Sequence, residues 1–355
     1  MPFGTIPNYF HELAKEFREN GYKVILILDD QPIDLPDDQK WLVHKKWPNR
    51  RPTGRQDFAF FMRLLWKEKP LLVLSNFGSM NIVTLCSFLC GVPNRWNYIH
   101  TLHSQIQTDL AKVTFFTKVL HYRKKILYRL VTQFLTNAVG TKNDVVDKFG
   151  VARSKIDVGS YLIPASTITY KQKEERSSNI CIVARLHKSK GHEVLLEQFR
   201  LLLKAYPEVN LNIVGDGHQK AALTQLCKEK NIESKVNFLG NVPNHSIGEI
   251  YSDCLVSISS SYYEAFGIVN IEALREGTPI ICTKTSGSLD IIVPGQNGAF
   301  FDLEDHSSLT ESFKIILQNW EHYSKGAMTT FKENYSLENL ATRVERMDKL
   351  LIKKK

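Results

Sequence analysis

Short apolar runs alternate with segments of helical periodicity along almost the whole chain. The runs at 23–28, 71–74 and 210–214 have the length and character of buried strands, and amphipathic segments such as 10–20 and 194–204 separate them. Parallel strands need a crossover between them, so this alternation predicts parallel sheets with helices on both faces. The pattern therefore favours an α/β fold of the doubly wound type.

The chain of 355 residues is longer than one ordinary core can serve, which predicts two domains. The alternation is interrupted near residue 166 by a polar stretch that contains the charged run 171–178 and indicates a linker. A second alternation starts at Asn179. We therefore expect a first domain over 1–165, a linker over 166–178, a second domain over 179–335 and a final helical segment over 336–355.

The overall charge and the cysteines limit the class of protein. A formal charge of +9 indicates an anionic partner, such as nucleotide phosphates, acidic lipids or nucleic acid. The six cysteines are scattered and form no C-x-x-C pair, which is typical of reduced core residues in a cytosolic protein. Residues 1–20 lack the charged start and apolar block of a signal peptide.

The stretch 71–92 has no charged residue and is about long enough to span a bilayer. Polar residues such as Asn76 and Asn81 interrupt it. A buried strand at 71–74, a polar turn and a buried helix at 82–89 are the interpretation we prefer.

The segment 255–274 is typical of a strand followed by a helix. The apolar run 255–259 comes first, and Ile268, Ile271 and Leu274 then recur at helical spacing. The unpaired N–H groups of a helix N-terminus suit a phosphate. Glu264 in the loop and Glu272 in the helix would flank that point. This layout can hold a ligand with a diphosphate in its middle and hydroxyl groups at both ends.

Two cations follow the strand predicted at 179–184. Arg185 offers a fork for two oxygens and Lys190 a point charge, which suits an anion. A solvated charged loop is the alternative. Since both this loop and the Glu264 loop follow strands of one sheet, both can reach one ligand.

Several motifs in the second half occur together, in order and at fixed spacing: 183–196, 213–217, 236–240, 263–280 and 286–298. This set resembles the retaining glycosyltransferases of the GT-B fold, in family 4 (group 1). The resemblance covers most of 179–300 and is looser before it. It implies two Rossmann-like domains facing a central cleft, an acceptor-side first domain, a nucleotide-sugar-binding second domain and a last helix that packs back on the first.

The resemblance also implies residue roles. Arg185 and Lys190 would bind the donor diphosphate and stabilise it as the leaving group. Glu272 would accept hydrogen bonds from the ribose, and Glu264 would hold the hydroxyls of the donor sugar. Backbone contacts to sugar and phosphate would come from the helix start: Phe266, Gly267 and Ile268.

In the first half of the chain, two residues correspond less directly to the pattern of the family. A histidine at the end of a first-domain strand would face the donor sugar, and we prefer His103 to His100 because it follows the strand predicted at 98–102. A histidine packed beside Trp96 is the alternative. Gly4 lies where the family has a Gly-rich loop touching donor or acceptor, but the strand that usually precedes this loop is missing.

The resulting expectation is metal-independent transfer, with no cofactor, of a sugar from a nucleotide-diphosphate donor to a saccharide or lipid-linked acceptor in polysaccharide or glycolipid assembly. No paired acidic metal motif is present. A sugar-nucleotide epimerase or a phosphorylase of the same fold is the enzymatic alternative. A basic nucleic-acid-binding protein is the remote alternative, because the expected recognition motifs are absent.

The segment 110–130 contains only basic charges among its apolar residues. Such a segment can dock on an anionic bilayer. A surface helix with one buried face is the alternative. We expect a peripheral location on the cytoplasmic face of the membrane, with these cations at the membrane or acceptor surface: Lys112, Lys118, Arg123, Lys124, Lys125 and Arg129.

Overall fold

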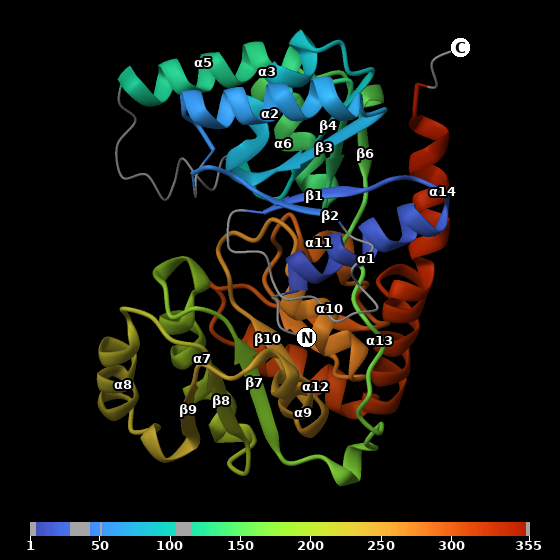
Figure 1. The fold of residues 1–355 in the computed structure, drawn as a ribbon. Coiled ribbons are helices and arrows are strands. Elements are labelled where there is room, and N and C mark those ends of the chain that lie inside the picture. The colour runs from blue at the N-terminus through green and yellow to red at the C-terminus, as the bar shows by residue number, and fades with distance from the viewer. Residues whose placement is uncertain (1–4, 29–42, 50–51, 104–114, 353–355) are drawn as a thin grey trace. The chain divides into compact units, whose positions relative to one another are not determined.

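The structure is a computed structural model that describes residues 5–28, 43–49, 52–103 and 115–352. The chain divides into two compact units (Figure 1). The N-terminal unit comprises residues 6–160 together with 340–355, and the C-terminal unit comprises 161–339 together with 1–5. Both are α/β units with parallel sheets, as the alternation predicts.

The C-terminal unit contains one parallel sheet in the order β12-β11-β10-β7-β8-β9. Its strands are β7 (Asn179–Val183), β8 (Asn210–Val214), β9 (Val236–Gly240), β10 (Val256–Ser259), β11 (Ile280–Cys282) and β12 (Gly298–Phe300). Its helices are α7 (His192–Ala205), α8 (Lys220–Glu229), α9 (Asn244–Asp253), α10 (Ile268–Arg275), α11 (Ser288–Ile291), α12 (Ser308–Gln318) and α13 (Trp320–Asn334).

Apolar side chains on one face of this sheet form the main core of the unit. Ile180 and Ile182 of β7 pack with Leu195 of α7 and Phe313 of α12, and all four are at most 2% exposed. Packing of this kind is what the alternating pattern in the sequence predicts.

The N-terminal unit has a four-stranded parallel sheet in the order β3-β4-β5-β6 and a two-stranded parallel sheet of β1 and β2. Its strands are β1 (Ile25–Leu28), β2 (Val43–Lys46), β3 (Leu72–Asn76), β4 (Asn94–Ile99), β5 (Gln133–Thr136) and β6 (Ile156–Val158). Its helices are α1 (Thr5–Glu19), α2 (Arg55–Glu68), α3 (Met80–Leu89), α5 (Phe115–Arg129), α6 (Val139–Phe149) and α14 (Leu340–Leu350).

The last helix, α14, groups with the N-terminal unit. Arg343 donates to the carbonyl of Ser160 at 2.7 Å, and the backbone N–H of Ile352 donates to Asn94 at 2.9 Å. These bonds join the end of the chain to β4 and to the segment after β6.

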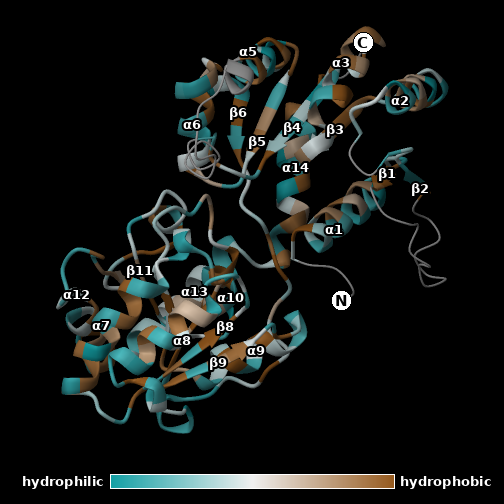
Figure 2. Ribbon diagram, turned by 90° about the vertical axis from the view of Figure 1, so that its left-hand side faces the viewer, coloured by the Kyte–Doolittle hydropathy of each residue, from teal (hydrophilic) through white to brown (hydrophobic). Residues whose placement is uncertain are grey.

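The charge-free stretch 71–92 forms β3, a 3-10 turn at Phe77–Ser79 and α3. The predicted order of strand, turn and helix is confirmed, but the prediction of a buried helix is wrong. Leu85, Phe88 and Leu89 of α3 are 37%, 48% and 56% exposed. The polar residues Thr84 and Ser87 of α3 are buried, at 2% and 0% exposed, so the sequence pattern of this helix does not reveal which of its faces is uncovered. Helix α3 contacts α2 and α5, and the ribbon coloured by hydropathy shows these helices close together (Figure 2).

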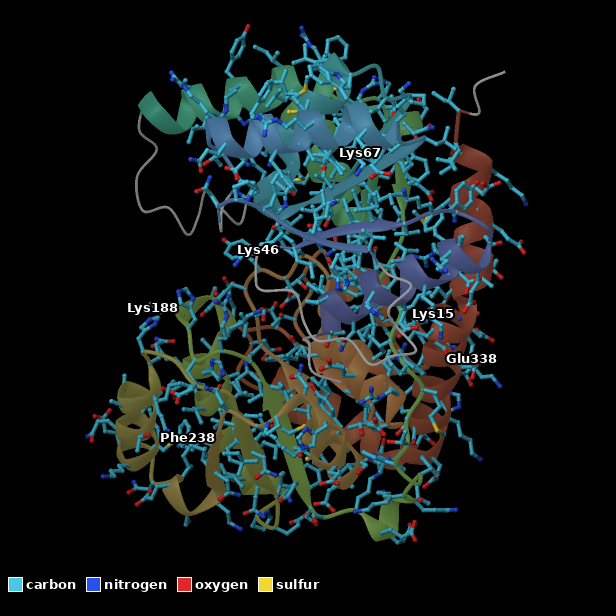
Figure 3. All side chains as sticks on the ribbon, in the orientation of Figure 1. Lys15, Lys46, Lys67, Lys188, Phe238 and Glu338 are labelled. Carbon is cyan, nitrogen blue, oxygen red and sulfur yellow. The ribbon has the colours of Figure 1, made fainter. Side chains whose placement is uncertain are left out.

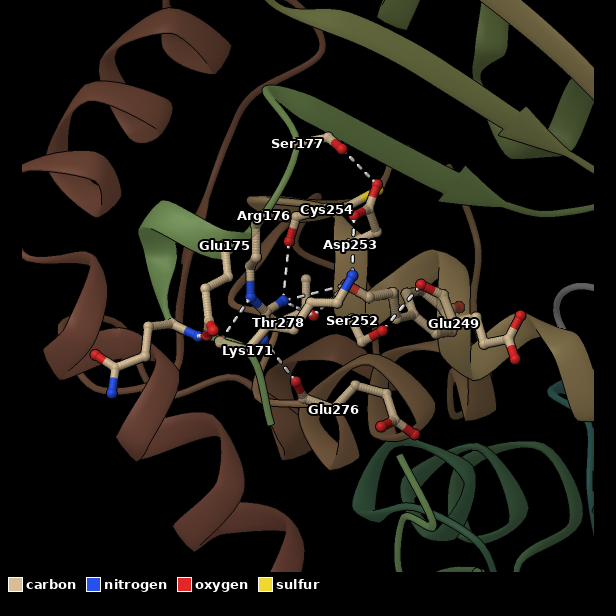
Figure 4. A network of polar contacts seen from close by, with 12 residues as sticks. Lys171, Glu175, Arg176, Ser177, Glu249, Ser252, Asp253, Cys254, Glu276 and Thr278 are labelled. Atoms are coloured by element: carbon tan, nitrogen blue, oxygen red, sulfur yellow. Dashed lines mark hydrogen bonds and ion pairs between the residues drawn. The ribbon is translucent and has the colours of Figure 1, made fainter. Parts of the chain in front are cut away.

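The segment predicted as a linker, 166–178, is part of the C-terminal unit and is tied to it by Arg176 (Figure 4). The Arg176 side chain is 7% exposed and donates to the carbonyl oxygens of Tyr251, Cys254 and Glu276. The charged run in the sequence therefore contains a buried structural arginine.

Candidate functional site

The strand order of the C-terminal sheet indicates where a ligand binds, before any side chain is considered. The chain runs from β7 outward to β8 and β9, and then returns to place β10 on the other side of β7. The loops after β7 and β10 therefore lead away in opposite directions. In open α/β sheets, this switch point is where ligands bind, at the carboxyl ends of the strands.

The loop after β7 carries both predicted cations and approaches the loop after β10 closely. It contains a 3-10 turn at Lys188–Lys190, and Lys188 is exposed (Figure 3). Gly191 follows with φ 66°, and a Cβ there would lie 2.1 Å from the carbonyl oxygen of Ser260. Only glycine allows this conformation and this approach.

Hydrogen bonds hold the two loops together. The Ser260 hydroxyl donates to the Lys190 carbonyl at 2.7 Å, and the Tyr262 N–H donates to the Ser189 carbonyl at 2.9 Å. Backbone bonds of this kind fix the positions of the side chains that the loops carry.

Lys190 and Glu264, one from each loop, form an ion pair. The distance from Lys190 Nζ to Glu264 Oε2 is 2.6 Å, and the side chains are 16% and 21% exposed. Arg185 is exposed and makes no ion pair within the described part of the chain. The loop therefore combines Lys190, which is paired with a carboxylate, with Arg185, which has no ion pair among the described residues.

Helix α10 begins directly after this pair. Its N-cap is Gly267, with φ 93°, and no side chain caps the helix. A Cβ on Gly267 would lie 2.9 Å from Asn270 Nδ2 and 3.4 Å from Glu264 Cγ. Glycine thus leaves the first turn of α10 uncovered beside Glu264, and the first backbone N–H groups, from Ile268 onward, suit an anion.

Phe266, just before α10, and Glu272, within it, are both largely removed from solvent but have different surroundings. The Phe266 side chain is 2% exposed, and its ring packs edge-on against Tyr161 and Tyr335. Phe266 can therefore offer its backbone to a ligand but not its ring. Glu272 lies one turn further along α10, and burial raises the pKa of its carboxyl.

Sequence analysis missed two buried polar residues near this site. Asn270 is 1% exposed, and neither its amide nitrogen nor its oxygen has a partner within the described residues. His192, the first residue of α7, is also 1% exposed with both ring nitrogens unpartnered. For Asn270 the sequence did contain a signal, because this residue is the polar one in the otherwise apolar helical run Ile268 to Ile271.

We expect His192 to make the C-terminal unit acid-sensitive. Burial, with a contribution from Lys190, lowers the pKa of His192 to about 4. The unfolded chain binds this proton near pH 6.5, so stability is fully present above pH 6.5 and is lost as the pH falls toward 4. At pH 5 the loss would be about 2 kcal/mol.

Urea unfolding at pH 7 and pH 5 measures this effect. His192→Leu should lose about 2 kcal/mol less between the two pH values than the unsubstituted chain. His245→Gln, at an exposed position, is the matched control and should behave like the unsubstituted chain. Equal acid losses in His192→Leu and in the unsubstituted chain would contradict the prediction.

The prediction that His103 directly follows a strand over 98–102 is wrong. Strand β4 covers Asn94–Ile99. It starts with polar residues because their side chains are paired: Asn94 donates to the carbonyl of Leu71 at 2.9 Å, and Asn97 accepts from Ser75 at 2.6 Å. His100 is therefore the histidine that directly follows the strand.

Aromatic rings enclose His100. Its ring stacks on Phe77 at 4.0 Å and on Tyr98 at 4.7 Å between centroids, and burial lowers its pKa to about 3. His100 is thus a neutral, packed histidine.

His103 belongs to a second cluster in the N-terminal unit. Its Nε2 lies 3.1 Å from Nδ1 of His121, and its backbone N–H donates to Asp144 at 2.7 Å. Burial and the nearby Lys124 and His121 lower the pKa of His103. The neutral ring therefore has one donor and one acceptor nitrogen, and its Nε2 is engaged with His121.

The remaining predicted residues are placed as follows. Gly4 and Lys112 lie outside the described residues, and so does the side chain of Lys118. Arg123 and Arg129 are exposed on α5, and Lys125 is half-buried. Lys124 differs from them, because its Nζ lies 5.3 Å and 5.1 Å from the ring centroids of Tyr128 and Phe149, and burial lowers its pKa.

The described residues lack two features that would point to a metal or to a membrane span. Within the described ranges, no group of three or more His, Cys, Asp or Glu side chains could hold a metal ion. In the same part of the chain, no helix combines the length and apolar character needed to cross a bilayer.

Two family descriptions match almost the whole chain. Residues 6–159 match "Glycosyltransferase Family 4", and residues 168–330 match "Glycosyl transferases group 1". With the parallel sheets of the two units, these matches define a class: the chain belongs to the GT-B glycosyltransferases of the group 1 and family 4 type. The predicted fold class and family are confirmed.

Individual relatives are similar over most of their length. The N-acetylgalactosamine-N,N'-diacetylbacillosaminyl-diphospho-undecaprenol 4-alpha-N-acetylgalactosaminyltransferase of Campylobacter jejuni is 27% identical, over 83% of this chain and 82% of the relative. The mannosylfructose-phosphate synthase of Agrobacterium fabrum is 26% identical, over 84% and 75%. The crystal structure of Anabaena HepE in complex with UDP and glucose has a TM-score of 0.75 at 15% identity, over 98% and 96%.

Proposed function

We propose that this glycosyltransferase moves a sugar, with retention of anomeric configuration and without a metal, from a nucleotide-diphosphate sugar to a saccharide or lipid-linked saccharide. The observation that carries the proposal is the Lys190–Glu264 ion pair beside the uncapped start of α10. The product would be a polysaccharide or glycolipid. Named relatives support this class of reaction, since one is named for a diphospho-undecaprenol substrate.

The charges of the site suit the bond that breaks. When the bond between the sugar and the diphosphate breaks, positive charge develops on the sugar and negative charge on the departing phosphate oxygen. Lys190, Arg185 and the first N–H groups of α10 stabilise the negative charge. The carboxylate of Glu264, beside Lys190, holds the sugar hydroxyls at the positive end.

Glu272 would bind the opposite end of the donor. Above its pKa the ionised carboxyl accepts hydrogen bonds from ribose hydroxyls, and because burial raises that pKa, protonation weakens these bonds at a higher pH than for an exposed glutamate. The Asn270 amide, on the first turn of α10 beside Gly267, has no partner among the described residues and is a candidate for an additional donor contact. The role of His103 toward the donor sugar stays a prediction.

We expect the two glutamates to differ in steady-state kinetics. Glu272→Ala should raise KM for the donor about tenfold or more with little change in kcat, because a lost hydrogen bond to a charged group costs about 1.5–3 kcal/mol. Glu264→Ala should mainly lower kcat. The reverse pattern would contradict the assignment of ribose to Glu272 and sugar to Glu264.

The proposed activity is tested by a thermal-shift screen of nucleotide sugars, followed by transfer assays with the donor that binds. A ligand at about 100 times its Kd adds about 2.7 kcal/mol of stability, which such a screen detects. Nucleoside diphosphate should be released only when an acceptor is added, and NMR of the product should show the donor's anomeric configuration.

The same assays separate the alternatives. An epimerase would change the donor without acceptor, and a phosphorylase would require free phosphate. Inversion of configuration would overturn the retaining mechanism, and loss of turnover in excess chelator would overturn metal independence.

A further inference from the structure

The loop between β10 and α10 presents two exposed tyrosines directly before Glu264. Tyr262 and Tyr263 are 47% and 44% exposed. Among the described residues of the C-terminal unit, they are the exposed Phe, Tyr and Trp side chains. In the same part of the chain, neither hydroxyl has a hydrogen-bond partner and neither ring contacts another ring. Adjacent exposed rings of this kind, beside a candidate site, mark an interaction surface.

Hydrogen bonds anchor the backbone on both sides of the tyrosines. Before them, the Ser261 carbonyl accepts from the Thr283 hydroxyl at 2.6 Å. After them, the Glu264 carbonyl accepts from the Gly287 N–H at 2.9 Å. The bond from the Tyr262 N–H to the loop after β7, at 2.9 Å, is a third anchor. Rings on a fixed backbone lose little conformational freedom when a ligand binds, so this loop suits recognition.

The order of residues along this segment decides which part of a ligand the tyrosines meet. In the proposed function, Glu272 binds the ribose, the start of α10 binds the diphosphate and Glu264 holds the donor sugar. The nucleobase is attached to the ribose, so it belongs to the end away from the tyrosines. Because Tyr262 and Tyr263 precede Glu264, they belong to the sugar end of the donor, where the acceptor hydroxyl must arrive.

Exposure separates the tyrosines from the donor site itself. The Lys190 and Glu264 side chains are 16% and 21% exposed, whereas Tyr262 and Tyr263 are nearly half exposed. The ion pair is therefore more enclosed than the rings. A ligand that covers the rings extends outward from the donor sugar, as an acceptor does.

We propose that Tyr262 and Tyr263 bind the acceptor by stacking on a pyranose ring next to the donor sugar. A pyranose presents C–H groups on its faces and hydroxyls at its edge, so one face packs on a tyrosine ring while the hydroxyls reach water or polar groups. An open-chain alcohol has no such face. The inference rests on the proposed function and deepens it, because it makes the reacting end of the acceptor a sugar ring.

Saturation-transfer NMR of the full chain tests this contact directly. The probes are the methyl glycosides of glucose, galactose and N-acetylglucosamine, with the nucleoside diphosphate from the thermal-shift screen present. At least one glycoside should show transfer, strongest at the ring protons of one face. Tyr262→Ala/Tyr263→Ala should lose this signal, and Tyr262→Phe/Tyr263→Phe, which keeps both rings, should retain it.

Kinetics with the same glycoside separate the acceptor from the donor. The double alanine variant should raise KM for the glycoside about tenfold or more, because it removes two stacking rings. It should leave KM for the nucleotide sugar, and the thermal shift that this ligand causes, unchanged. The double phenylalanine variant should resemble the unsubstituted chain. Tyr122→Ala, which removes an exposed tyrosine of α5, is the matched control and should do the same.

Absence of saturation transfer to all three glycosides in the unsubstituted chain would overturn the proposal. Equal KM for the glycoside in the double alanine variant and in the control would also overturn it. A raised KM for the nucleotide sugar with an unchanged KM for the glycoside would contradict it by assigning the tyrosines to the donor. A failure of the proposed function is distinguishable, because then no nucleotide sugar would stabilise the unsubstituted chain.

Discussion

Replacing Lys190 with methionine is expected to lower kcat about 10²- to 10³-fold while leaving the fold intact. A fixed cation aimed at the charge that develops on a leaving group contributes about 3 kcal/mol or more to catalysis. Lys190 lies beside the start of α10, where both the ion pair with Glu264 and the uncapped N–H groups meet. Methionine keeps most of the length of the side chain and removes its charge.

The control for this prediction lies two residues away. Lys188→Met removes an exposed lysine of the same 3-10 turn and should leave kcat unchanged. Affinity for the nucleoside diphosphate found in the screen should fall in Lys190→Met, and affinity for the nucleoside alone should not. A loss shared equally by both ligands would show that Lys190 does not act on the phosphates.

A second variant separates the charge of Lys190 from its effect on Glu264. The ion pair at 2.6 Å means that Lys190→Met also leaves a carboxylate without its partner. If that were the whole effect, Lys190→Met/Glu264→Gln would recover kcat. We expect no recovery, because both groups act on the donor.

Much of the C-terminal unit could be predicted from the sequence, because its strands are short runs in which apolar residues prevail. The run at 210–214 is β8 as predicted, and Glu272 lies in the predicted helix. What the sequence could not provide is the order of strands in the sheet. The switch point between β7 and β10 depends on that order, and so does the direct contact of Lys190 with Glu264.

The N-terminal unit was predicted less well because hydrogen bonds replace hydrophobicity in its core. Asn94 and Asn97 are 1% and 2% exposed, which is possible because each side chain is paired. A pattern of apolar residues cannot detect such a strand, so β4 was displaced and His103 was assigned to its end. The same limit applies to α3, whose exposed apolar face looks like a core face in the sequence.

Arg176 shows the converse limit, because it lies in the segment predicted as a linker although its side chain is only 7% exposed. Its guanidinium donates to four carbonyl oxygens and to the hydroxyl of Thr278, at distances from 2.8 to 3.2 Å. It also lies 4.7 Å from the ring centroid of Trp320. This one side chain connects the segment before β7 with the ends of α9 and α10 (Figure 4).

We therefore expect Arg176→Ala to destabilise the C-terminal unit by about 3–5 kcal/mol, the range for breaking a buried charged network by removing one partner. The carbonyls of Tyr251, Cys254 and Glu276 would lose a charged donor and remain buried. Arg176→Lys keeps the charge but not the planar set of donors, so it should recover only part of the loss.

Urea unfolding of the full chain measures these differences, and Lys204→Ala, at an exposed position of α7, should change stability by less than about 0.5 kcal/mol. A loss below about 1 kcal/mol in Arg176→Ala would mean that water replaces the guanidinium. Because Glu276 directly follows α10, a large loss in Arg176→Ala should also weaken donor binding at physiological temperature, since Glu272 lies in that helix. The charged run that resembles a linker in the sequence would then be part of what holds the donor site in place.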